Sequence, residues 1–518
     1  MKNFYQEGPR LTNTFESDEI LQKFLRKVLP PDCQKVALPH LAHLGQRAIT
    51  DMWEWAAEAE AQQPVHVPFD PWGRRIDEIH VSNGWKQLEK VAAEEGIVAT
   101  AYERRFGSYS RVYQMALLYL YSPSSAIFSC PLAMTDGGAR ALELYATPDL
   151  KNRAMSHLTS KNPAQFWTAG QWMTERYGGS DVSGSATEAI PFSGASDFGA
   201  THTLHGTKWF TSATTSQMAL TLARPQGAPE GSRGLSLFYL ELRDDKNRLN
   251  KIEIHRLKDK LGTKALPTAE LSLQGTPARM IGEVGEGVKR ITAVLNITRI
   301  YNSICAVGHM RRALDLAQDY SRKRQAFGKL LIDHPLHRET LRWLESDFRH
   351  CFAFSFYVAH LLGKEEVGEI SASERTMLRT LTPVLKLYTG KKALSISSEV
   401  VEIFGGAGYV EDTGLPRLLR DGQVFSIWEG TTNVLSLDML RAFQKEQSLP
   451  VIMEFLKNSG AAKAAIPSFT EKWTAFQKLV GRLTQPSSKE EDWEVHARQL
   501  SLTLGDLMGE ALAFEYEL

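Results

Sequence analysis

The order of hydrophobic periodicities along the chain restricts its fold more than any other feature of the sequence. The first part carries helix-like patches at Glu19–Leu29 and Leu38–Glu60, with Pro30-Pro31 and the turn-rich stretch Pro64–Gly73 as predicted connections. The middle part holds short β-prone runs such as Leu235–Leu240 and Ala269–Leu273. From about Gly285 to Arg441 the apolar residues return to helical spacing, and Ile300, Ile304, Val307 and Leu314 are predicted to share one helix face. Helices, then strands, then helices indicate an α+β chain with segregated domains rather than an alternating α/β fold.

The length of the chain predicts several domains, because 518 residues are too many for one compact core. The changes of pattern divide the sequence into four regions. They are a mainly helical N-terminal domain with long connections (1–165), a middle antiparallel β-domain (166–284), a helical bundle (285–441) and an appended helical region (442–518). The stretch Pro486-Ser487-Ser488 predicts a hinge within the last region.

The charge of the chain argues against two classes of partner. Sixty basic and sixty acidic residues cancel, so the net charge gives no reason to expect nucleic acid or an anionic membrane as partner. From Ala442 to Leu518, eight Lys and Arg stand against eleven Asp and Glu, a net charge of −3. Phosphate binding needs clustered positive charge, so this region is not expected to bind DNA.

The compartment is predicted from cysteines and from apolar stretches. The four cysteines form no C-x-x-C pair, which argues against a disulfide framework or a zinc site and favours a reducing compartment. The first residues lack the apolar segment of a secretory signal. The most apolar stretch, Cys351–Gly363, is shorter than the roughly 18–20 residues that span a bilayer and is predicted to be a core helix. We expect a soluble, cytoplasmic protein without a membrane span.

A first segment that could bind a ligand combines paired glycines with hydroxyl groups. It comprises Met173–Val182, and Gly206–Thr211 follows later in the chain. Paired glycines allow backbone N–H groups to approach an anion closely, and neighbouring hydroxyls add donors. The alternative interpretation is an ordinary β-turn with a Ser or Asp cap, because Gly-Gly turns are common.

Two further segments of this kind lie in the C-terminal half. Arg324–Gly328 follows a predicted helix, and most arginines at a helix end simply face solvent or offset the helix dipole. The last segment contains Ile403–Tyr409 and then Ile427–Asn433. Within it, Glu429 lies between a tryptophan and a glycine, where desolvation would raise the pKa of the carboxylate and make it a better base. The alternative is that Glu429 begins a helix and favours its dipole.

Taken together and in this order, the segments resemble the signatures of the acyl-CoA dehydrogenase family. Those signatures look like T-E-x-x-x-G-S-D, W-I-T, R-x-x-F-G, I-F-G-G-x-G and Y-E-G-T, and the resemblance runs from about Gln165 to Leu440. Within the family the chain is similar to the AidB-like branch. The features that carry this narrower resemblance are the long N-terminal extension with Trp72–Asp77, the segment Leu257–Gly262, the Trp-Glu-Gly triplet at 428–430 and the helical tail.

The resemblance implies a fold, a cofactor and an assembly. The fold is a helical domain, a β-barrel-like domain and a four-helix bundle, with FAD between barrel and bundle and a second subunit completing its site. The residues that match the FAD-binding positions are Met173, Thr174, Gly179, Ser180, Trp209, Thr211, Arg324, Phe327, Gly405, Gly406, Thr431 and Asn433. Because two chains would share one cofactor site, the resemblance implies a homotetramer, a dimer of dimers.

The resemblance also implies the α,β-dehydrogenation of an acyl-CoA thioester, with an electron-transfer flavoprotein as acceptor. Glu429 would take the α-proton while flavin N5 takes the β-hydride. The N–H of the base residue would help to stabilise the enolate-like oxygen. Arg299, Trp428 and Gly430 match substrate-side positions near the base.

Several positions depart from the family pattern and leave two alternative functions open. Arg176-Tyr177 replaces the common Pro-Gly, Ala326 stands where a hydroxyl residue is frequent, and Trp428 replaces the usual Tyr beside the base. The first alternative is a weakly catalytic or non-catalytic flavoprotein that binds acyl-CoA or a fatty acid as a sensor or sink. The second, which the AidB-like resemblance implies, is a protein that protects DNA under alkylation stress.

Overall fold

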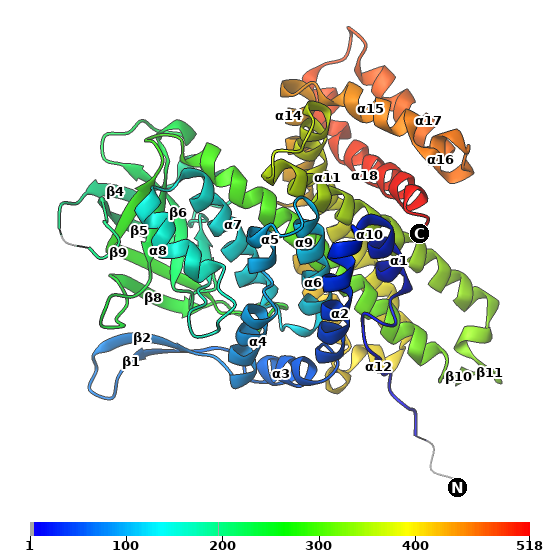
Figure 1. Ribbon diagram of the computed structural model, residues 1–518, viewed down its shortest axis with the longest axis horizontal. Helices are drawn as coiled ribbons and strands as arrows, with labels where there is room; N and C mark the ends of the chain where they lie inside the picture. Colours follow the sequence, from blue (N-terminus) through cyan, green and yellow to red (C-terminus); the bar gives the residue numbers. More distant parts are fainter. Residues whose placement is uncertain (1–4, 195) are drawn as a thin grey trace. The chain divides into compact units, whose positions relative to one another are not determined.

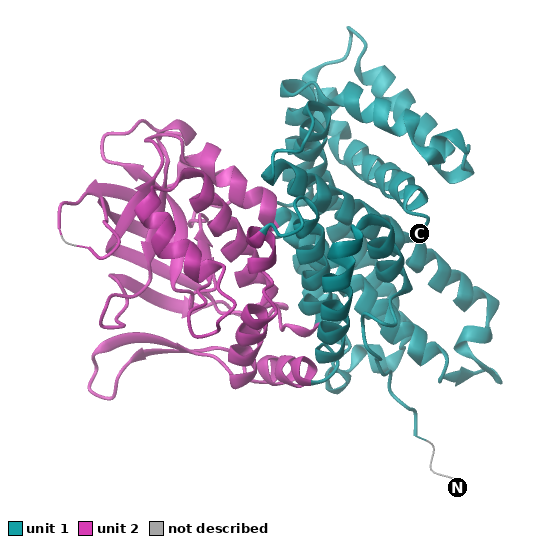
Figure 2. Ribbon diagram, viewed as in Figure 1, with its two compact units in different colours: residues 1–50, 104–123, 299–518 teal, residues 51–103, 124–298 magenta. Residues whose placement is uncertain are grey.

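The computed structural model describes residues 5–194 and 196–518, and the chain divides into two compact units (Figure 2). Unit 1 contains the residues up to Thr50 together with Arg104–Pro123 and Arg299–Leu518. Unit 2 contains Asp51–Glu103 and Ser124–Thr298. Helices of the N-terminal region contribute to both units, so these units are a different division of the chain from the four predicted ranges, which remain a prediction.

Unit 2 is built around a seven-stranded sheet that closes on itself (Figure 1). Its strands are β3 (Ala169–Trp172), β4 (Glu188–Pro191), β5 (His202–Ser212), β6 (Met218–Pro225), β7 (Ser236–Glu241), β8 (Ile252–Leu257) and β9 (Thr268–Ile281). The pairings β6–β4, β4–β5, β5–β9, β9–β7 and β7–β6 form a closed ring, with β3 added to β6 and β8 added to β9. Closure leaves the ring without free edges, which protects it from pairing with other chains.

The sheet is mainly antiparallel, as predicted, but two of its pairings are parallel. Strands β3 and β6 pair in parallel, and so do β4 and β6. Parallel neighbours need a long connection, and the chain between β3 and β6 supplies one because it contains β4 and β5. Apolar alternation records which face of a strand is buried, and it carries no information on the direction of the neighbouring strand.

The strands β6 and β7 are buried on both faces. One set of alternate residues packs together among the strands, with Ala219, Phe238 and Leu240 as members. The other set, which includes Leu220 and Tyr239, packs with apolar residues of the helices α7 (Ser129–Tyr145) and α8 (Pro148–Leu158). Two apolar faces explain why the sequence of these strands is nearly continuous in apolar residues. The other helices wholly within unit 2 are α3 (Asp51–Ala61), α4 (Asn83–Glu94) and α5 (Ala99–Glu103).

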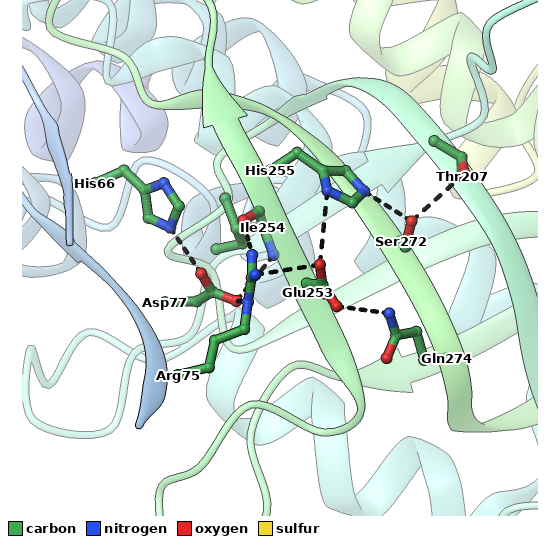
Figure 3. A network of polar contacts seen from close by, with 9 residues as sticks. All are labelled: His66, Arg75, Asp77, Thr207, Glu253, Ile254, His255, Ser272 and Gln274. Atoms are coloured by element: carbon green, nitrogen blue, oxygen red, sulfur yellow. Dashed lines mark hydrogen bonds and ion pairs between the residues drawn. The ribbon is translucent and has the colours of Figure 1, made fainter. Parts of the chain in front are cut away.

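The proline-rich stretch after Pro64, predicted to be a connection, instead contains a β-hairpin with strands β1 (Val65–Phe69) and β2 (Arg75–His80). The buried side chain of Asp77 links this hairpin to β8 (Figure 3). The backbone of Asp77 is left-handed, with φ of 47°. Its carboxylate lies 2.8 Å from His66 Nε2 and accepts hydrogen bonds from Arg75 Nε and the backbone N–H of Ile254. Pro68 obscures the strand pattern in the sequence, because proline is tolerated only at the edge of a sheet.

Unit 1 is helical. Its long helices are α9 (Gly287–Ser321), which enters the unit at Arg299, α10 (Pro335–Glu366) and α11 (Ala372–Ile403). The shorter ones are α1 (Glu19–Val28), α2 (Pro31–Arg47), α6 (Tyr109–Tyr121), α12 (Gly406–Tyr409), α13 (Pro416–Val424) and α14 (Thr432–Lys445). The predicted apolar face of α9 is confirmed, since Ile300, Ile304, Val307 and Leu314 are fully buried. The apolar stretch at Cys351 lies within α10, and no helix among the described residues is both long and apolar enough to cross a membrane.

The C-terminal tail packs closely against the long helices of unit 1. It contains α15 (Ser448–Asn458), α16 (Gly460–Lys463), α17 (Pro467–Leu483) and α18 (Glu490–Glu515). On α18, Asp506 accepts a hydrogen bond of 2.9 Å from the hydroxyl of Tyr388 on α11. A Cβ at Gly505 would lie 2.5 Å from the Tyr388 ring, so only glycine permits this approach. The tail is therefore part of the core of unit 1.

Candidate active site

The predicted base Glu429 lies in the loop between α13 and α14. Its backbone is left-handed, with φ of 57°, and Gly430 follows with φ of 112°. A non-glycine residue in this conformation costs of the order of 1–3 kcal/mol, and such residues cluster at functional sites. Thr431 is the N-cap of α14, so Glu429 lies outside the first turn of the helix. The alternative interpretation of Glu429 as a helix-starting residue is therefore wrong.

Side chains from two long helices hold this loop by its backbone carbonyl groups. From α9, Asn302 Nδ2 donates to Phe425 O at 3.0 Å, and Arg299 Nε donates to Glu429 O at 3.3 Å. From α11, Lys386 Nζ donates to Gly430 O at 2.6 Å. The structure therefore brings Arg299 and Gly430, two of the predicted substrate-side residues, together with the predicted base.

Arg299 is itself held by a second arginine through a shared carboxylate. Its Nη1 lies 2.7 Å from Asp438 Oδ2, and Arg379 Nη2 lies 2.7 Å from Asp438 Oδ1. Burial favours the neutral acid, but Arg299 and Arg379 together hold the pKa of Asp438 below its usual value. Asp438 is thus a carboxylate that fixes the orientation of Arg299 and offsets part of its charge.

Lys386 is a site residue that the sequence reasoning missed. Its side chain is fully buried on α11, and burial lowers the pKa of the ammonium group to about 7. The negative charge of Glu429 opposes this shift, while the positive charges of Arg299 and Lys391 add to it. The available signal was a lysine at the centre of the apolar run Val384–Tyr388, where an unpaired charge is costly.

The remaining predicted substrate-side residue and two predicted cofactor residues flank Glu429. Trp428 is half-buried in the loop itself. Thr431 and Asn433 are exposed at the start of α14. The Asn433 side-chain oxygen accepts a hydrogen bond of 3.1 Å from Arg498 of α18, a contact made by the tail that the sequence did not indicate.

In unit 2, the predicted flavin residues meet at a tight turn after β3. The backbone of Glu175 pairs with that of Gly178, and Gly178 has φ of 126°. A Cβ at Gly179 would lie 2.4 Å from Thr174 Oγ1, so only glycine fits beside the threonine. The N–H of Trp209 donates to Thr174 O at 3.0 Å. The turn is therefore a specific structure that joins three predicted flavin residues, with Met173 half-buried before it and Ser180 exposed after it.

A buried ion pair holds this turn against the sheet. The carboxylate of Glu175 accepts hydrogen bonds from Lys208 Nζ at 2.9 Å, from the backbone N–H of Ala186 at 2.7 Å, and from the N–H and hydroxyl of Thr187. Lys208 Nζ also donates to Leu222 O at 3.0 Å. Burial would raise the pKa of Glu175, but Lys208 and the other donors hold it below its usual value. Both residues lie inside quoted motifs, yet the sequence suggested no role for either.

Trp209 and one further flavin candidate, Thr211, lie on β5. The ring of Trp209 faces two cations, with Lys258 Nζ 3.8 Å and the Arg176 guanidinium carbon 5.3 Å from its centre. Arg176 belongs to the segment that departs from the family pattern. Thr211 is buried, and its hydroxyl donates to Ala269 O at 2.8 Å. That hydroxyl can therefore only accept a hydrogen bond from a ligand.

The last group of predicted cofactor residues lies on exposed turns of unit 1. Arg324 precedes a two-residue hairpin turn, in which Phe327 and Gly328 have φ of 49° and 75°. This geometry is typical of a type I′ turn and directs the Phe327 side chain into solvent, where it is 99% exposed. Gly405, with φ of 58°, and Gly406 are exposed, and a Cβ at either position would meet no atom within 4 Å. Their backbone is open to close approach by a ligand or another chain.

Comparisons with known proteins cover nearly the whole chain. Residues 9–162 match the adaptive response protein AidB N-terminal domain, residues 170–276 the acyl-CoA dehydrogenase middle domain and residues 285–443 the acyl-CoA dehydrogenase C-terminal domain. Acyl-CoA dehydrogenase family member 11 of Caenorhabditis elegans is 47% identical over 455 residues, which cover 86% of this chain and 73% of that protein.

Two solved structures extend the similarity to the full length of the chain. The structure of ACDH-11 from Caenorhabditis elegans in complex with C11-CoA has a TM-score of 0.93 and 43% identity, and the match covers 99% of this chain and 89% of that one. The apo-form of Bd2924 has a TM-score of 0.96 and 72% identity over 100% of both chains. The overall architecture, including the tail, is thus shared with these proteins.

Proposed function

Since the chain belongs to the acyl-CoA dehydrogenase family, we propose that it catalyses the α,β-dehydrogenation of an acyl-CoA thioester, with Glu429 as general base. The observation that carries this proposal is the loop of Glu429. Glu429 has a left-handed backbone conformation there, and donors from α9 and α11 bind the carbonyl groups of Glu429 and Gly430. These contacts give the base a defined position. The C11-CoA complex of the ACDH-11 relative supports an acyl-CoA ligand for this chain too.

The family consists of flavoproteins, and we assign FAD as the flavin of this chain. The turn at Thr174 fits such a group, because Gly178 and Gly179 leave its backbone free of side chains beside an exposed hydroxyl at Ser180. Met173, Thr174, Trp209 and Thr211 would meet the flavin ring system, and Gly179 and Ser180 the pyrophosphate. Bound flavin supplies the acceptor for the hydride that leaves the β-carbon of the substrate.

The chain contributes proton transfer and oxyanion stabilisation to the proposed reaction. The carboxylate of Glu429 removes the α-proton, and its own backbone N–H donates to the thioester oxygen, where negative charge accumulates. Arg299 acts through the backbone, because it donates to the carbonyl group of Glu429. Trp428 limits the space beside the base. Reducing equivalents then pass to an electron-transfer flavoprotein.

The function is tested by anaerobic titration of the purified yellow protein with acyl-CoAs of graded chain length. We expect stoichiometric bleaching of the flavin absorbance by at least one chain length. The free fatty acid of the same length is the control and should cause no bleaching, because only the thioester acidifies the α-proton. If a fatty chain perturbs the spectrum and no acyl-CoA bleaches it, a sensor or sink is the better assignment.

The exposed turns of unit 1 support an assembly in which two chains complete one flavin site. Ser321 follows Arg299 by 22 residues in α9, so at 1.5 Å per residue the end of the helix lies about 33 Å from Arg299. This distance exceeds the length of an extended dinucleotide. Arg324 and Phe327 therefore serve the flavin of a neighbouring subunit rather than one held near Glu429 of their own chain. We assign a homotetramer, a dimer of dimers.

Light scattering of the flavin-loaded protein is expected to give the mass of a tetramer. Arg324→Ala removes a charge-assisted contact to pyrophosphate, worth about 1.5–3 kcal/mol, and should weaken flavin binding by roughly ten- to hundredfold. Arg322→Ala removes an exposed arginine two residues earlier and should leave flavin affinity unchanged. A monomer that retains its full flavin content would contradict the assembly.

A further inference from the structure

We propose that Lys386 is a positioning residue for the general base, because its ammonium group holds the peptide plane between Gly430 and Thr431, the second plane after the α-carbon of Glu429. This inference rests on the proposed function of Glu429. The contact is direct and short: Nζ donates to Gly430 O at 2.6 Å. The side chain reaches this carbonyl from the fully buried centre of α11, where a lysine has no access to water.

The two carbonyl groups that follow the Glu429 α-carbon are held by two different cations. Arg299 on α9 binds the carbonyl of Glu429, and Lys386 on α11 binds that of Gly430. Together these contacts define ψ of Glu429 and the backbone angles of Gly430. The left-handed conformation of the loop needs such external support, because a glutamate does not favour it by itself.

The charge of Lys386 gives it a second effect on the base. The groups that face it are Glu429 in the loop, Arg299 on α9 and Lys391 on its own helix. Burial lowers the pKa of Lys386 to about 7, so the side chain is an ammonium below that pH and an amine above it. In the charged form it stabilises the carboxylate of Glu429 and lowers the pH at which the base becomes active. Asp438 offsets part of the charge of Arg299.

Lys386→Met tests both effects with a side chain of similar length that suits a buried site. We expect flavin reduction by acyl-CoA to slow by about ten- to hundredfold, because a shift of about 1 Å in a catalytic group has this consequence. The acidic limb of the pH–rate profile, where Glu429 loses its proton, should move to higher pH by about one unit, since the carboxylate loses a neighbouring cation. The Kd for acyl-CoA should change by no more than a few-fold. Lys386→Arg keeps the donor and the charge and should return the limb towards the wild-type position.

Lys445→Met is the matched control, because it removes an exposed lysine at the end of α14 that does not contribute to the pKa of Lys386. It should leave the rate of flavin reduction and the amide exchange of the Glu429 loop unchanged. Amide hydrogen exchange in the ligand-free protein provides a readout that needs no turnover. In Lys386→Met, the segment from Trp428 to Thr431 should exchange at least about tenfold faster, since a charge-assisted hydrogen bond is lost.

The outcomes separate this inference from the proposed function. If no acyl-CoA bleaches the wild-type flavin, the proposed function fails, while the exchange measurement still decides whether Lys386 holds the loop. The inference would be overturned if Lys386→Met showed the same rate of flavin reduction, the same pH–rate profile and the same amide exchange of the loop as the wild type. A slower variant with an unshifted limb and unchanged loop exchange would overturn it as well, because the loss would then arise elsewhere.

Discussion

Glu429→Gln is expected to slow the reduction of flavin by acyl-CoA by at least about 10²–10⁴-fold, the usual contribution of a positioned general base. Glutamine keeps the shape of the side chain and tolerates the same backbone, but it cannot accept the α-proton. The anchors of the loop bind carbonyl groups of the main chain, so the substitution leaves them in place. Flavin content and thermal stability should therefore match those of the wild type.

Ligand binding by Glu429→Gln distinguishes a base from a binding residue. The perturbation of the flavin spectrum by acyl-CoA should persist or occur at lower concentration, because burying a neutral amide costs less than burying a carboxylate. Glu446→Gln, at an exposed position after α14, provides the matched control and should behave as the wild type. Stopped-flow measurement of flavin bleaching decides the question. Equal rates in Glu429→Gln and wild type would show that another group removes the proton.

Lys208→Met is expected to lower the free energy of unfolding by about 3–5 kcal/mol, because it leaves the buried carboxylate of Glu175 without its cation. The turn that carries Thr174 is held to the sheet through this carboxylate. Flavin binding should therefore weaken together with stability. Urea unfolding at neutral pH measures the first effect and flavin titration the second. Lys246→Met, at an exposed loop position, is the control and should change neither.

The pH dependence of Lys208→Met follows from the pKa of Glu175, which lies below its usual value in the folded wild type. A carboxyl group with a depressed pKa contributes stability above its unfolded pKa and loses that contribution as the pH falls through the folded pKa. The stability difference between wild type and variant should thus be largest at neutral pH and shrink in acid. Glu175→Gln combined with Lys208→Met should recover part of the loss, because no charge remains buried. An equal difference at every pH would contradict the ion-pair explanation.

The local character of each element could be predicted from sequence. Periodicity identified the helices and strands in their order, because the burial of alternate or every third to fourth residue is a local property. The ordered motifs identified the family and the candidate base Glu429. Two glycines of these motifs were informative as well, because Gly179 and Gly430 occupy places where a close approach or a positive φ excludes a side chain.

Only the tertiary structure decided which distant groups meet. Lys386 and Gly430 are 44 residues apart, Lys208 and Glu175 are 33 apart, and Arg299 and Asp438 are 139 apart. No periodicity records such pairs, since a buried charge reveals its partner only once the chain has folded around both. The same holds for the parallel pairing of β6, the packing of α18 into unit 1 and the hairpin held by Asp77. The sequence by itself therefore determined the elements and the chemical groups, whereas the folded chain determined what positions and charges them, because electrostatic and hydrogen-bond partners are chosen by distance in space.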